Sequence, residues 1–443
     1  MNPKNKKTLT IIIIVLAVIG TFVGLYFSAG KEPFIRTALS GLTLGSLFFL
    51  VAAGLTLIFG LMDVLNFAQG SMFMLGAYIG WQFYTNPTFI FGILPQILAF
   101  GCGVMLVSVI KPYLIRLELS ETWVKALPKA AYFLALVAMV ISFIGFDILG
   151  LAKTAMVAAT VTTAGNPLAE ISAQEPLSQY WFRPLLLLVS GALVAFATSK
   201  PGNKNEFAPK DKMLHKAIVP GVLFLLTIIT TLIRIPAPEA VLLMDGNWRF
   251  VIAILVSIIF GFVFGAVVET TLIRPLYVRP TFIIIMTLGL SYVIRELVQM
   301  LWDPLAYQMS RPPLFAQLGK AASLGEWLKN GNATIDIAGV VFPTYRLFVI
   351  LLGILMFIFI TLLMTKSRLG MIIRAGVQDP QMVEALGINV RSVFTLVFGL
   401  GIAMAALGGI GAGPFLPIQP LMGDSYQMQG LITVVIGGMG SYV

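Results

Sequence analysis

The residue types that most often carry out catalysis or bind metals are almost absent from this chain. Its 443 residues include one cysteine, Cys102, and one histidine, His215. A single cysteine forms no disulfide within the chain, and these two residues supply no cluster that would hold zinc or iron. Cys102 lies between two glycines in an apolar run, which favours packing, and His215 lies among lysines, which favours a solvated side chain. We therefore expect no catalytic site, no metal site and no cofactor.

A phosphate-binding loop is not evident in the sequence either. Such a loop has the pattern Gly-x-x-x-x-Gly-Lys-Ser/Thr, and neither Gly30-Lys31 nor Gly319-Lys320 fits it. If ATP drives the activity of this protein, another chain must bind the ATP.

Four uncharged polar residues in or beside apolar runs are the candidates for contact with a small solute. Asn66 and Gln69 interrupt one apolar region, and Thr287 and Ser291 lie one helical turn apart on one face of another. Their amides and hydroxyls offer hydrogen bonds to a zwitterion in a transport pathway. A structural interpretation also stands, because Ser and Thr in membrane helices often bond their own backbone, and Asn and Gln often tie helices together. The sequence leaves both interpretations open.

The composition indicates what kind of fold must position these residues. Hydrophobic residues make up 58% of the chain and charged residues 11%, with a mean hydropathy of +0.95, whereas soluble domains carry about 25% charge. Long unbroken apolar runs take the place of the alternation typical of outer-membrane strands, which argues against a porin. We expect an all-α, polytopic integral membrane protein.

Apolar runs of about 20 residues, the length that crosses a bilayer, predict about 11–12 transmembrane helices. Residues 60–70 interrupt one run and favour either two spans or one broken, re-entrant helix, and residues 151–181 are only moderately apolar. The runs are Leu9 to Phe27, Thr37 to Gly60, Phe67 to Tyr84, Phe89 to Ile110, Ala130 to Gly150, Phe182 to Thr198, Ala217 to Ile233, Phe250 to Ile273, Thr281 to Leu301, Tyr345 to Met364, Val393 to Ala412, and Met428 onward.

Glycines at four-residue spacing predict close helix packing within these runs. Three such pairs occur, Gly41/Gly45, Gly76/Gly80 and Gly261/Gly265. A denser group of glycines and prolines between residues 399 and 417 predicts a span that ends in an irregular segment.

The net charge of +10 is compared first with membrane orientation, and only an excess that orientation does not explain would suggest an anionic partner. If each run crosses once and the N-terminus is cytoplasmic, 18 of the 29 Lys and Arg residues fall in the segments on the cytoplasmic side. This asymmetry agrees with the rule that basic residues stay inside. The excess charge therefore indicates membrane orientation, and no nucleic acid partner is expected.

Ionisable residues inside apolar runs cost about 2.5 to 3.5 kcal/mol each at mid-bilayer and need an explanation. Arg295 and Glu296 are adjacent, so on a helix their side chains point about 100° apart and are not expected simply to neutralise each other. Arg295 either extends to the membrane interface or lines a pathway, and the sequence does not decide between the two. Glu269 lies near the end of its run, where we expect contacts at the helix end.

The polar segment 366–391 has the pattern of a short helix between two spans. It has a basic start, an Asp379-Pro380 opening, a short helix that carries Glu384 and Ala385, and Gly387 as a stop. The stretch 379–388 has two acids and no Lys or Arg. This favours a protein partner, although an amphipathic helix lying on the lipid surface is the alternative.

Four ordered blocks of the sequence together resemble the permeases of branched-chain amino acid ABC transporters. The segment 366–391 resembles the loop with which such permeases contact the ATPase. The other blocks are residues 41–70, which end in Asn-Phe-Ala-Gln-Gly, residues 269–276 (ETTLIRPL) with 287–291 (TLGLS), and residues 437–441 (GGMGS). By this resemblance, the residues expected to couple to the ATPase are Arg374, Asp379, Glu384, Ala385 and Gly387.

The resemblance implies a permease subunit of an ATP-driven importer for branched-chain or related small amino acids. It also implies cytoplasmic ATP-binding subunits, a second permease subunit, an extracytoplasmic solute-binding protein, surrounding lipids and a bacterial inner membrane. Relatives that carry urea or short amides are an alternative. A stand-alone secondary transporter is a weaker one, because ion or proton coupling needs intramembrane carboxylates, of which only Glu296 and Asp147 are candidates.

Three departures from the family pattern shape the expected domain organisation. Gln69 stands where the family usually has a histidine, residues 87–249 have no counterpart in compact members, and the chain ends at Val443 where relatives continue, which suggests C-terminal truncation. We expect a membrane anchor over residues 1–36, permease core over 37–86 and 250–443, and an inserted membrane region over 87–249.

Overall fold

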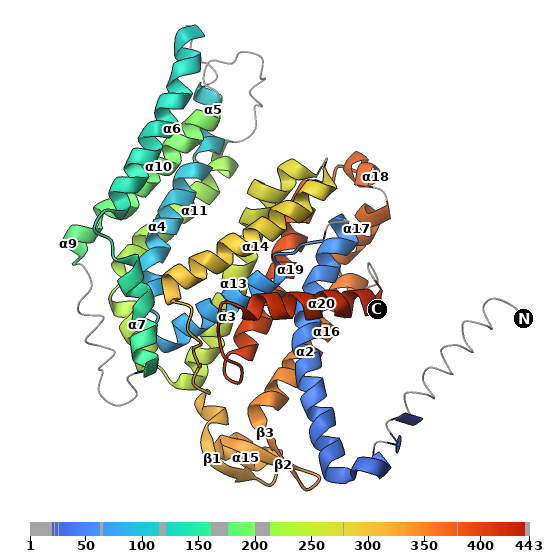
Figure 1. Cartoon of the computed structure of the whole chain (residues 1–443). Helices are drawn as coiled ribbons and strands as arrows, with labels where there is room; N and C mark the ends of the chain where they lie inside the picture. Colours follow the sequence, from blue (N-terminus) through green and yellow to red (C-terminus); the bar gives the residue numbers. More distant parts are fainter. Residues whose placement is uncertain are drawn as a thin grey trace, which may run out of the picture. The chain divides into compact units, whose positions relative to one another are not determined.

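Helices make up most of the chain, and the expected all-α, polytopic membrane architecture is confirmed (Figure 1). The structure is a computed structural model and describes residues 20–438, except for residues 22, 25, 63–64, 115–120, 161–175, 200–212, 278 and 379. The chain divides into two compact units. Unit 1 comprises the described residues of 1–81, 246–299 and 304–443, and unit 2 those of 82–245 and 300–303.

Among the described residues, eight helices are long and apolar enough to cross a bilayer, or nine if one bent pair counts as a span. This number is smaller than the 11–12 spans predicted from the sequence. Most of the first run lies outside the described residues, and the helices at 69–85 and 422–437 are shorter than a full crossing. The bent pair, Ala217–Leu232 with Pro236–Leu243, turns by 71° where prolines follow the first helix.

Unit 1 is built around one buried helix, α19, which packs against α13 and α2. Small residues allow this approach: Gly261 and Gly265 of α13 face Ala406 and Ile402 of α19. The predicted packing role is confirmed for this pair and for Gly76/Gly80, whereas Gly41 and Gly45 have no atom within 4 Å of an added Cβ. The helices of unit 1 are α2 (Lys31–Met62), α3 (Gln69–Thr85, its last turn in unit 2), α13 (Gly246–Val268), α14 (Pro280–Trp302, its last residues in unit 2), α16 (Thr344–Lys366), α17 (Arg368–Gln378), α18 (Pro380–Ala385), α19 (Val390–Ala412) and α20 (Met422–Gly437).

Unit 2 covers most of the range that we expected to be inserted. Its central helix α4 packs on α10 through Gly103 and Gly191, at a contact where an added Cβ would overlap the opposing backbone. Residues 148–160 form helix α7, within the region that the sequence left ambiguous. The helices are α4 (Thr88–Met105), α5 (Val107–Leu114), α6 (Glu121–Phe143), α7 (Ile148–Thr160), α9 (Leu177–Tyr180), α10 (Phe182–Thr198), α11 (Met213–Leu232) and α12 (Pro236–Leu243).

A small three-stranded sheet lies between α14 and α16, in a segment for which the sequence predicted no helix or strand. Its order is β1-β2-β3, with β1 (Gln317–Ala321) parallel to β2 (Asn332–Ile337) and β2 antiparallel to β3 (Val340–Pro343). Helix α15 (Leu324–Asn330) makes the crossover, and Ser323 caps it. Ala338 and Gly339, both with positive φ, form the tight β2–β3 turn.

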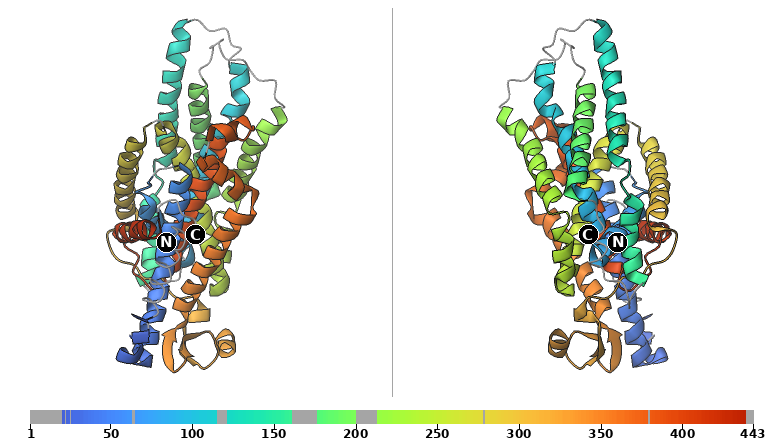
Figure 2. Two further views of the ribbon diagram at one scale, coloured as in Figure 1. Left: turned by 90° about the vertical axis from the view of Figure 1, so that its right-hand side faces the viewer. Right: turned by 90° about the vertical axis from the view of Figure 1, so that its left-hand side faces the viewer.

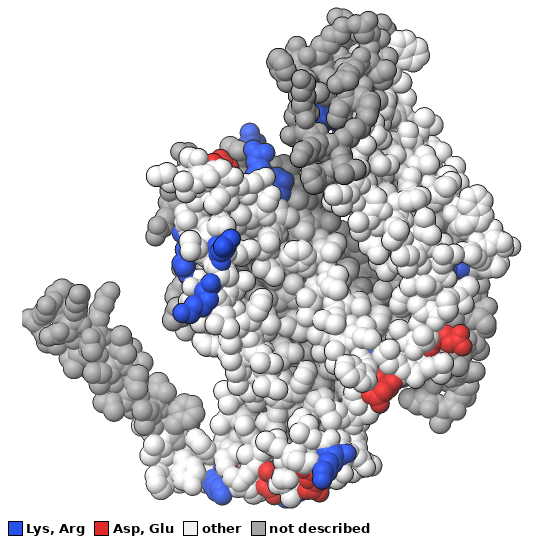
Figure 3. Space-filling model, turned by 180° about the vertical axis from the view of Figure 1, so that it is seen from behind, with Lys and Arg blue, Asp and Glu red and all other residues white. Residues whose placement is uncertain are grey.

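The two ends of unit 1 differ in charge. Helix α16 follows directly after β3 and leads into α17, so the sheet and α17–α18 lie at its opposite ends (Figures 1 and 2). On the face drawn in Figure 3, charged side chains of both signs gather at the end with the sheet, mostly Lys and Arg lie toward the other end, and an uncharged stretch lies between. This is the pattern of a membrane-embedded body with two aqueous ends.

Candidate functional site

The break between α2 and α3 carries two of the predicted pathway residues, Asn66 and Gln69, and both are buried. The Asn66 side chain holds the turn by accepting the Ala68 N–H at 3.0 Å, and the Gln69 N–H donates to the Asn66 carbonyl at 3.4 Å. Asn66 therefore starts α3 as a polar side chain that replaces a missing backbone partner.

Gln69 links this break to α19, and Gln427 links it to α20. Its Nε2 donates to the Gly401 carbonyl of α19 at 2.8 Å, and its Oε1 accepts from Asn66 Nδ2 at 3.2 Å. Gln427 of α20 accepts the Gly70 N–H at 2.6 Å and donates to the Asn66 carbonyl at 3.4 Å. Gly54 of α2 makes room, because a Cβ there would overlap both Gln69 Nε2 and the Gly401 carbonyl.

Thr287 and Ser291 of α14 reach the same break, so the structure brings together all four predicted pathway residues. Thr287 Oγ1 accepts the Phe67 N–H at 3.2 Å and donates to the Ile284 carbonyl, and Ser291 Oγ lies 2.7 Å from Ser71 Oγ. We define the polar cluster as Asn66, Gln69, Ser71, Thr287, Ser291 and Gln427. Sequence reasoning missed Ser71, two residues after Gln69, and Gln427, just before the last predicted run.

The polar cluster contains no ionisable side chain, and its amides and hydroxyls bond to one another or to backbone. Such a network resists opening, because each buried group left without a partner costs about 1–3 kcal/mol. A solute that enters must therefore exchange these bonds for its own. The arrangement suits a small molecule with several donors and acceptors, and it gives no group for proton transfer.

A separate cavity of about 170 Å³ lies between α2, α16 and α20. Thr56, Thr361 and Thr433 are its polar lining residues, and each donates to a carbonyl of its own helix. None of the predicted pathway residues lines it. The cavity is therefore an apolar gap between helices, distinct from the polar cluster.

The predicted short helix between two spans is present as α18, which starts at Pro380 and ends at Ala385. Gly387 adopts φ +81°, and its N–H donates to the Glu384 carbonyl at 2.9 Å while the Ile388 N–H reaches the Val383 carbonyl. This left-handed glycine ends the helix as predicted. Asp379 lies outside the described residues.

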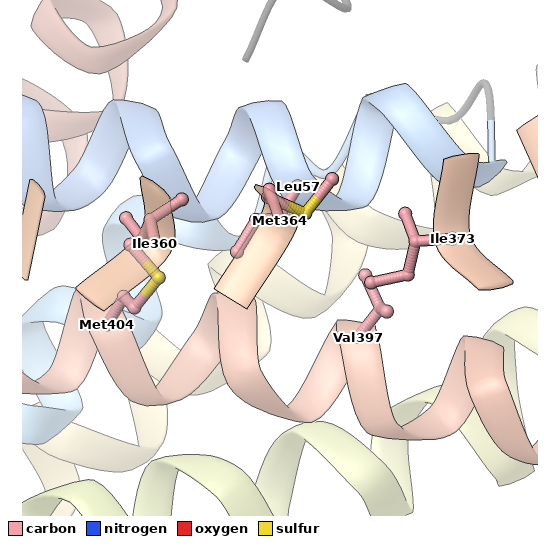
Figure 4. Packing of buried hydrophobic residues seen from close by; sticks show 6 residues of the cluster. All are labelled: Leu57, Ile360, Met364, Ile373, Val397 and Met404. Carbon is pink, nitrogen blue, oxygen red and sulfur yellow. The ribbon is translucent and has the colours of Figure 1, made fainter. Parts of the chain in front are cut away.

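The segment around α18 is anchored by apolar side chains on one side and exposed on the other. Ile373 of α17 joins a buried cluster with Leu57, Ile360, Met364, Val397 and Met404 (Figure 4), and Val383 is also buried. Glu384 and Ala385 are exposed. The exposed surface also includes large apolar side chains, Met371, Met382 and Leu386.

Arg374 has a partner within the chain. Its Nη1 donates to the Met364 carbonyl in the last turn of α16, where backbone carbonyls have no helical partner. This bond fixes α17 against α16 and explains the position of Arg374 without an ATPase.

Arg295 neither stands alone nor extends free to the interface. Its Nη1 lies 3.0 Å from Asp424 Oδ2 of α20, and its Nε lies 3.6 Å from Glu296 Oε1. The expectation that adjacent Arg295 and Glu296 do not neutralise each other is wrong in part, because the long side chains bend toward each other. The main partner, Asp424, is distant in sequence and could not be inferred from it.

Comparison with known proteins finds one family whose match covers residues 186–443, which belong partly to unit 2 and mostly to unit 1. The permease component of branched-chain amino acid transport systems matches residues 186–443. The chain is 27% identical over 200 residues to the high-affinity branched-chain amino acid transport system permease protein LivH of Salmonella typhimurium and to that of Escherichia coli K12; each match covers 44% of this chain and 61% of the relative. It is 29% identical over 187 residues to BraD of Pseudomonas aeruginosa, a permease protein of the same kind of system, over 42% of this chain and 57% of the relative.

These matches therefore span less than two thirds of the length of the curated relatives. No solved structure matches the chain significantly.

Proposed function

The chain belongs to the permease component family of branched-chain amino acid transport systems, and from this premise we propose that it is the membrane subunit of an ATP-driven importer for branched-chain or related small amino acids. The proposed partners are cytoplasmic ATP-binding subunits, a second permease subunit and an extracytoplasmic solute-binding protein. The proposed location is a bacterial inner membrane, with α17–α18 on the cytoplasmic side, in agreement with the excess of Lys and Arg in residues 365–392.

The observation that carries this proposal is the surface at α18. A six-residue helix ends at a left-handed glycine, and it exposes Glu384 beside Met382 and Leu386. Large exposed apolar side chains beside a single acid suit a protein groove better than water or anionic lipid. Because Ile373 and Val383 are buried, a force on α18 reaches the helix bundle rather than being lost in a loose loop.

The polar cluster is the proposed point of contact with substrate. Asn66 and Gln69 come from α3 with its preceding turn, Thr287 and Ser291 come from α14, and Gln69 also bonds the Gly401 carbonyl of α19. These three helices would need to shift for access to alternate. Amide and hydroxyl groups bind both the ammonium and the carboxylate of a zwitterion without adding a fixed charge. The relatives' names supply the branched-chain substrate class.

The docking part of the proposal is tested by co-purification of tagged chain with the ATP-binding subunits encoded with it. We expect Glu384→Arg to reduce the recovered ATPase at least tenfold, because it places the wrong charge in the middle of the α18 surface. The matched control is Glu239→Arg, which reverses an exposed acid in the first turn of α12, another short helix that begins with proline. Equal ATPase recovery with all three chains would show that α18 is not the docking surface.

The substrate part is tested by ATP-dependent uptake into vesicles that contain the co-purified assembly. Leucine, isoleucine and valine are compared with urea and acetamide at equal concentration. We expect uptake of the amino acids and not of urea or acetamide. We expect Thr287→Ala and Ser291→Ala to reduce this uptake while the chain still folds. Uptake of urea alone would replace the substrate class, and uptake unaffected by both variants would remove the polar cluster from the pathway.

A further inference from the structure

Glu269 is a fully buried carboxylate that the proposed pathway and docking surface do not use. It opens a short π-helical segment, Glu269–Ile273, at the end of α13, which is followed by a 3₁₀ turn, Arg274–Leu276. Buried carboxylates persist only where paired and hydrogen-bonded, and π-helical turns within helices frequently occur at functional positions. The buried carboxylate and the π-helical segment are therefore two independent features that single out Glu269.

Three side chains satisfy the Glu269 carboxylate. Arg274 donates through Nη2 at 2.8 Å and Nε at 3.2 Å, Tyr277 donates its hydroxyl, and Thr395 of α19 donates from Oγ1 at 2.7 Å. Arg274 Nη2 also reaches Thr395 Oγ1 at 2.6 Å. We call these four residues the clamp.

The wider turn of the π-helix explains the clamp's geometry. In an α-helix, residues five apart point to different faces, whereas the π-helical i→i+5 repeat brings Arg274 back over Glu269. The bidentate guanidinium–carboxylate pair then leaves room for the two hydroxyls. The Tyr277 ring also meets Phe394 of α19 edge-on at 5.5 Å.

The clamp lies where the chain enters two helices of the polar cluster. Helix α14 begins three residues after Tyr277 and carries Thr287 and Ser291. Helix α19 begins at Val390, soon after α18 and the Gly387 turn, and six residues after Thr395 its Gly401 carbonyl accepts Gln69. At about 1.5 Å per residue, the clamp is about 9 Å along α19 from that bond.

We propose that Glu269 is a positioning residue that makes α19 and the α13–α14 connection move as one body, so that displacement of α18 reaches the polar cluster from two helices at once. This inference rests on the proposed function. Without the clamp, the start of α19 could shift against α14, and movement at α18 would no longer change the Gln69, Thr287 and Ser291 contacts together. Glu269 would not touch substrate.

The test measures how many ATP molecules are hydrolysed per substrate molecule moved by the full assembly in vesicles. The variants are Glu269→Gln, which weakens the bond to Arg274, and Thr395→Val, which removes the hydroxyl of α19 and keeps the residue's shape. We expect the ratio to rise at least about fivefold in both, the lower end of a typical coupling between two sites. The control is Thr271→Val in the same π-helical segment, because the Thr271 hydroxyl bonds only its own helix at Val267. We expect it to keep the wild-type ratio.

Hydrogen exchange distinguishes coupling from a general structural role. On addition of ATP, the wild-type assembly should change amide exchange both at residues 380–388 and at residues 66–71, and in Thr395→Val the change should be confined to 380–388. If Thr395→Val kept both the wild-type ratio of ATP hydrolysed to substrate moved and the wild-type pattern of exchange, the clamp proposal would be overturned. This outcome decides the matter even if Glu269→Gln fails to assemble. If the wild-type chain recovers no ATPase and moves no substrate, the proposed function itself fails, and the clamp proposal fails with it for that separate reason.

Discussion

The hydrogen bonds between helices differ in kind between most of unit 2 and unit 1. In the described part of unit 2, Ser190 donates to the Ala135 carbonyl at 2.7 Å, Tyr180 to Gly92 at 2.8 Å, and buried Arg183 to Ser142 and Ile144 at 2.8 and 2.9 Å, all backbone oxygens. Trp302 differs from these, because it donates to the Gln82 side chain at 2.7 Å. In unit 1, side chains also meet side chains from other elements, as in Ser71 with Ser291 and Arg295 with Asp424.

This difference indicates which unit is built to rearrange. A backbone carbonyl has one fixed place on its helix, so a bond to it holds the helix pair in one position. Paired side chains can change rotamers and exchange partners, which allows two discrete arrangements of the same helices. We infer that the side-chain pairs of unit 1 rearrange more readily than the contacts of Ser190, Tyr180 and Arg183 in unit 2.

The largest expected loss of stability comes from adding a side chain at the closely packed glycines, a feature that both units share. Gly409→Val in unit 1 and Gly103→Val in unit 2 would each drive a side chain into an opposing backbone, Phe73 and Leu188 respectively. We expect each to destabilise by about 3 kcal/mol or more, seen as a lower Tm in detergent. Gly41→Ala, which has no atom within 4 Å of the added Cβ, is the control and should not lower Tm. Tolerance of Gly103→Val alone would show that unit 2 is not rigid.

The next effect separates the units. Glu269→Ala leaves Arg274 without its carboxylate, and removal of one partner from a buried ion pair costs about 3–5 kcal/mol. Because the Arg274 side chain is 32% exposed and can turn to solvent, we expect about 2–3 kcal/mol. The comparison is Ser190→Ala in unit 2, for which about 1 kcal/mol is expected. Thermal denaturation of both variants and of Glu269→Ala/Thr395→Val measures whether the unit 1 bonds act as a network. Strict additivity in the double variant would contradict that.

Gln69→Leu should have a smaller effect on stability and a large one on uptake. It leaves the Gly401 carbonyl and the Asn66 amide each without one partner. We expect this loss to destabilise the fold by about 1–2 kcal/mol. Gln69→Glu retains an oxygen that accepts from Asn66, loses the amide donor to Gly401 and places an ionisable group in the buried cluster, so its effect combines a lost bond with the cost of burying a carboxyl. If both variants transported normally, the polar cluster would be as static as the bonds of unit 2.

Local pattern predicted much of this molecule. Apolar length placed α10 at the observed residues, and the Gly387 stop and the shared face of Thr287 and Ser291 follow from helix geometry. The sheet over residues 317–343 was missed because a polar segment between spans was treated as a loop, although Ile335-Asp336-Ile337 alternates and precedes a turn at Ala338-Gly339.

Long-range pairings were not predictable from the sequence. Thr395 lies 126 residues from Glu269 and Asp424 lies 129 residues from Arg295, and no periodicity relates residues on separate helices. Only packing of α19 on α13 brings the first pair together, and that packing depends on Gly261 and Gly265.

The smallest effect concerns a second ion pair of unit 1, on the sheet, and tests whether burial rather than charge makes Glu269 strong. Hydrogen bonds from the Lys320 ammonium and from the Gly339 N–H lower the pKa of the partly exposed Asp336 carboxyl below its usual 3.8. A carboxyl with a lowered folded-state pKa stabilises the fold above its unfolded pKa, and that contribution disappears as pH falls through the folded pKa. The Tm difference between wild type and Asp336→Asn should therefore be small at pH 6, as for other partly solvent-exposed pairs, and vanish once the pH has fallen below the folded-state pKa. High salt should shrink it as well, because water screens this pair, whereas the Tm difference caused by Glu269→Ala should persist in the same salt. If salt reduced both Tm differences equally, the buried clamp would be electrostatically no different from a surface pair, and its assignment as a rigid connection between α19 and the α13–α14 connection would lose its physical basis.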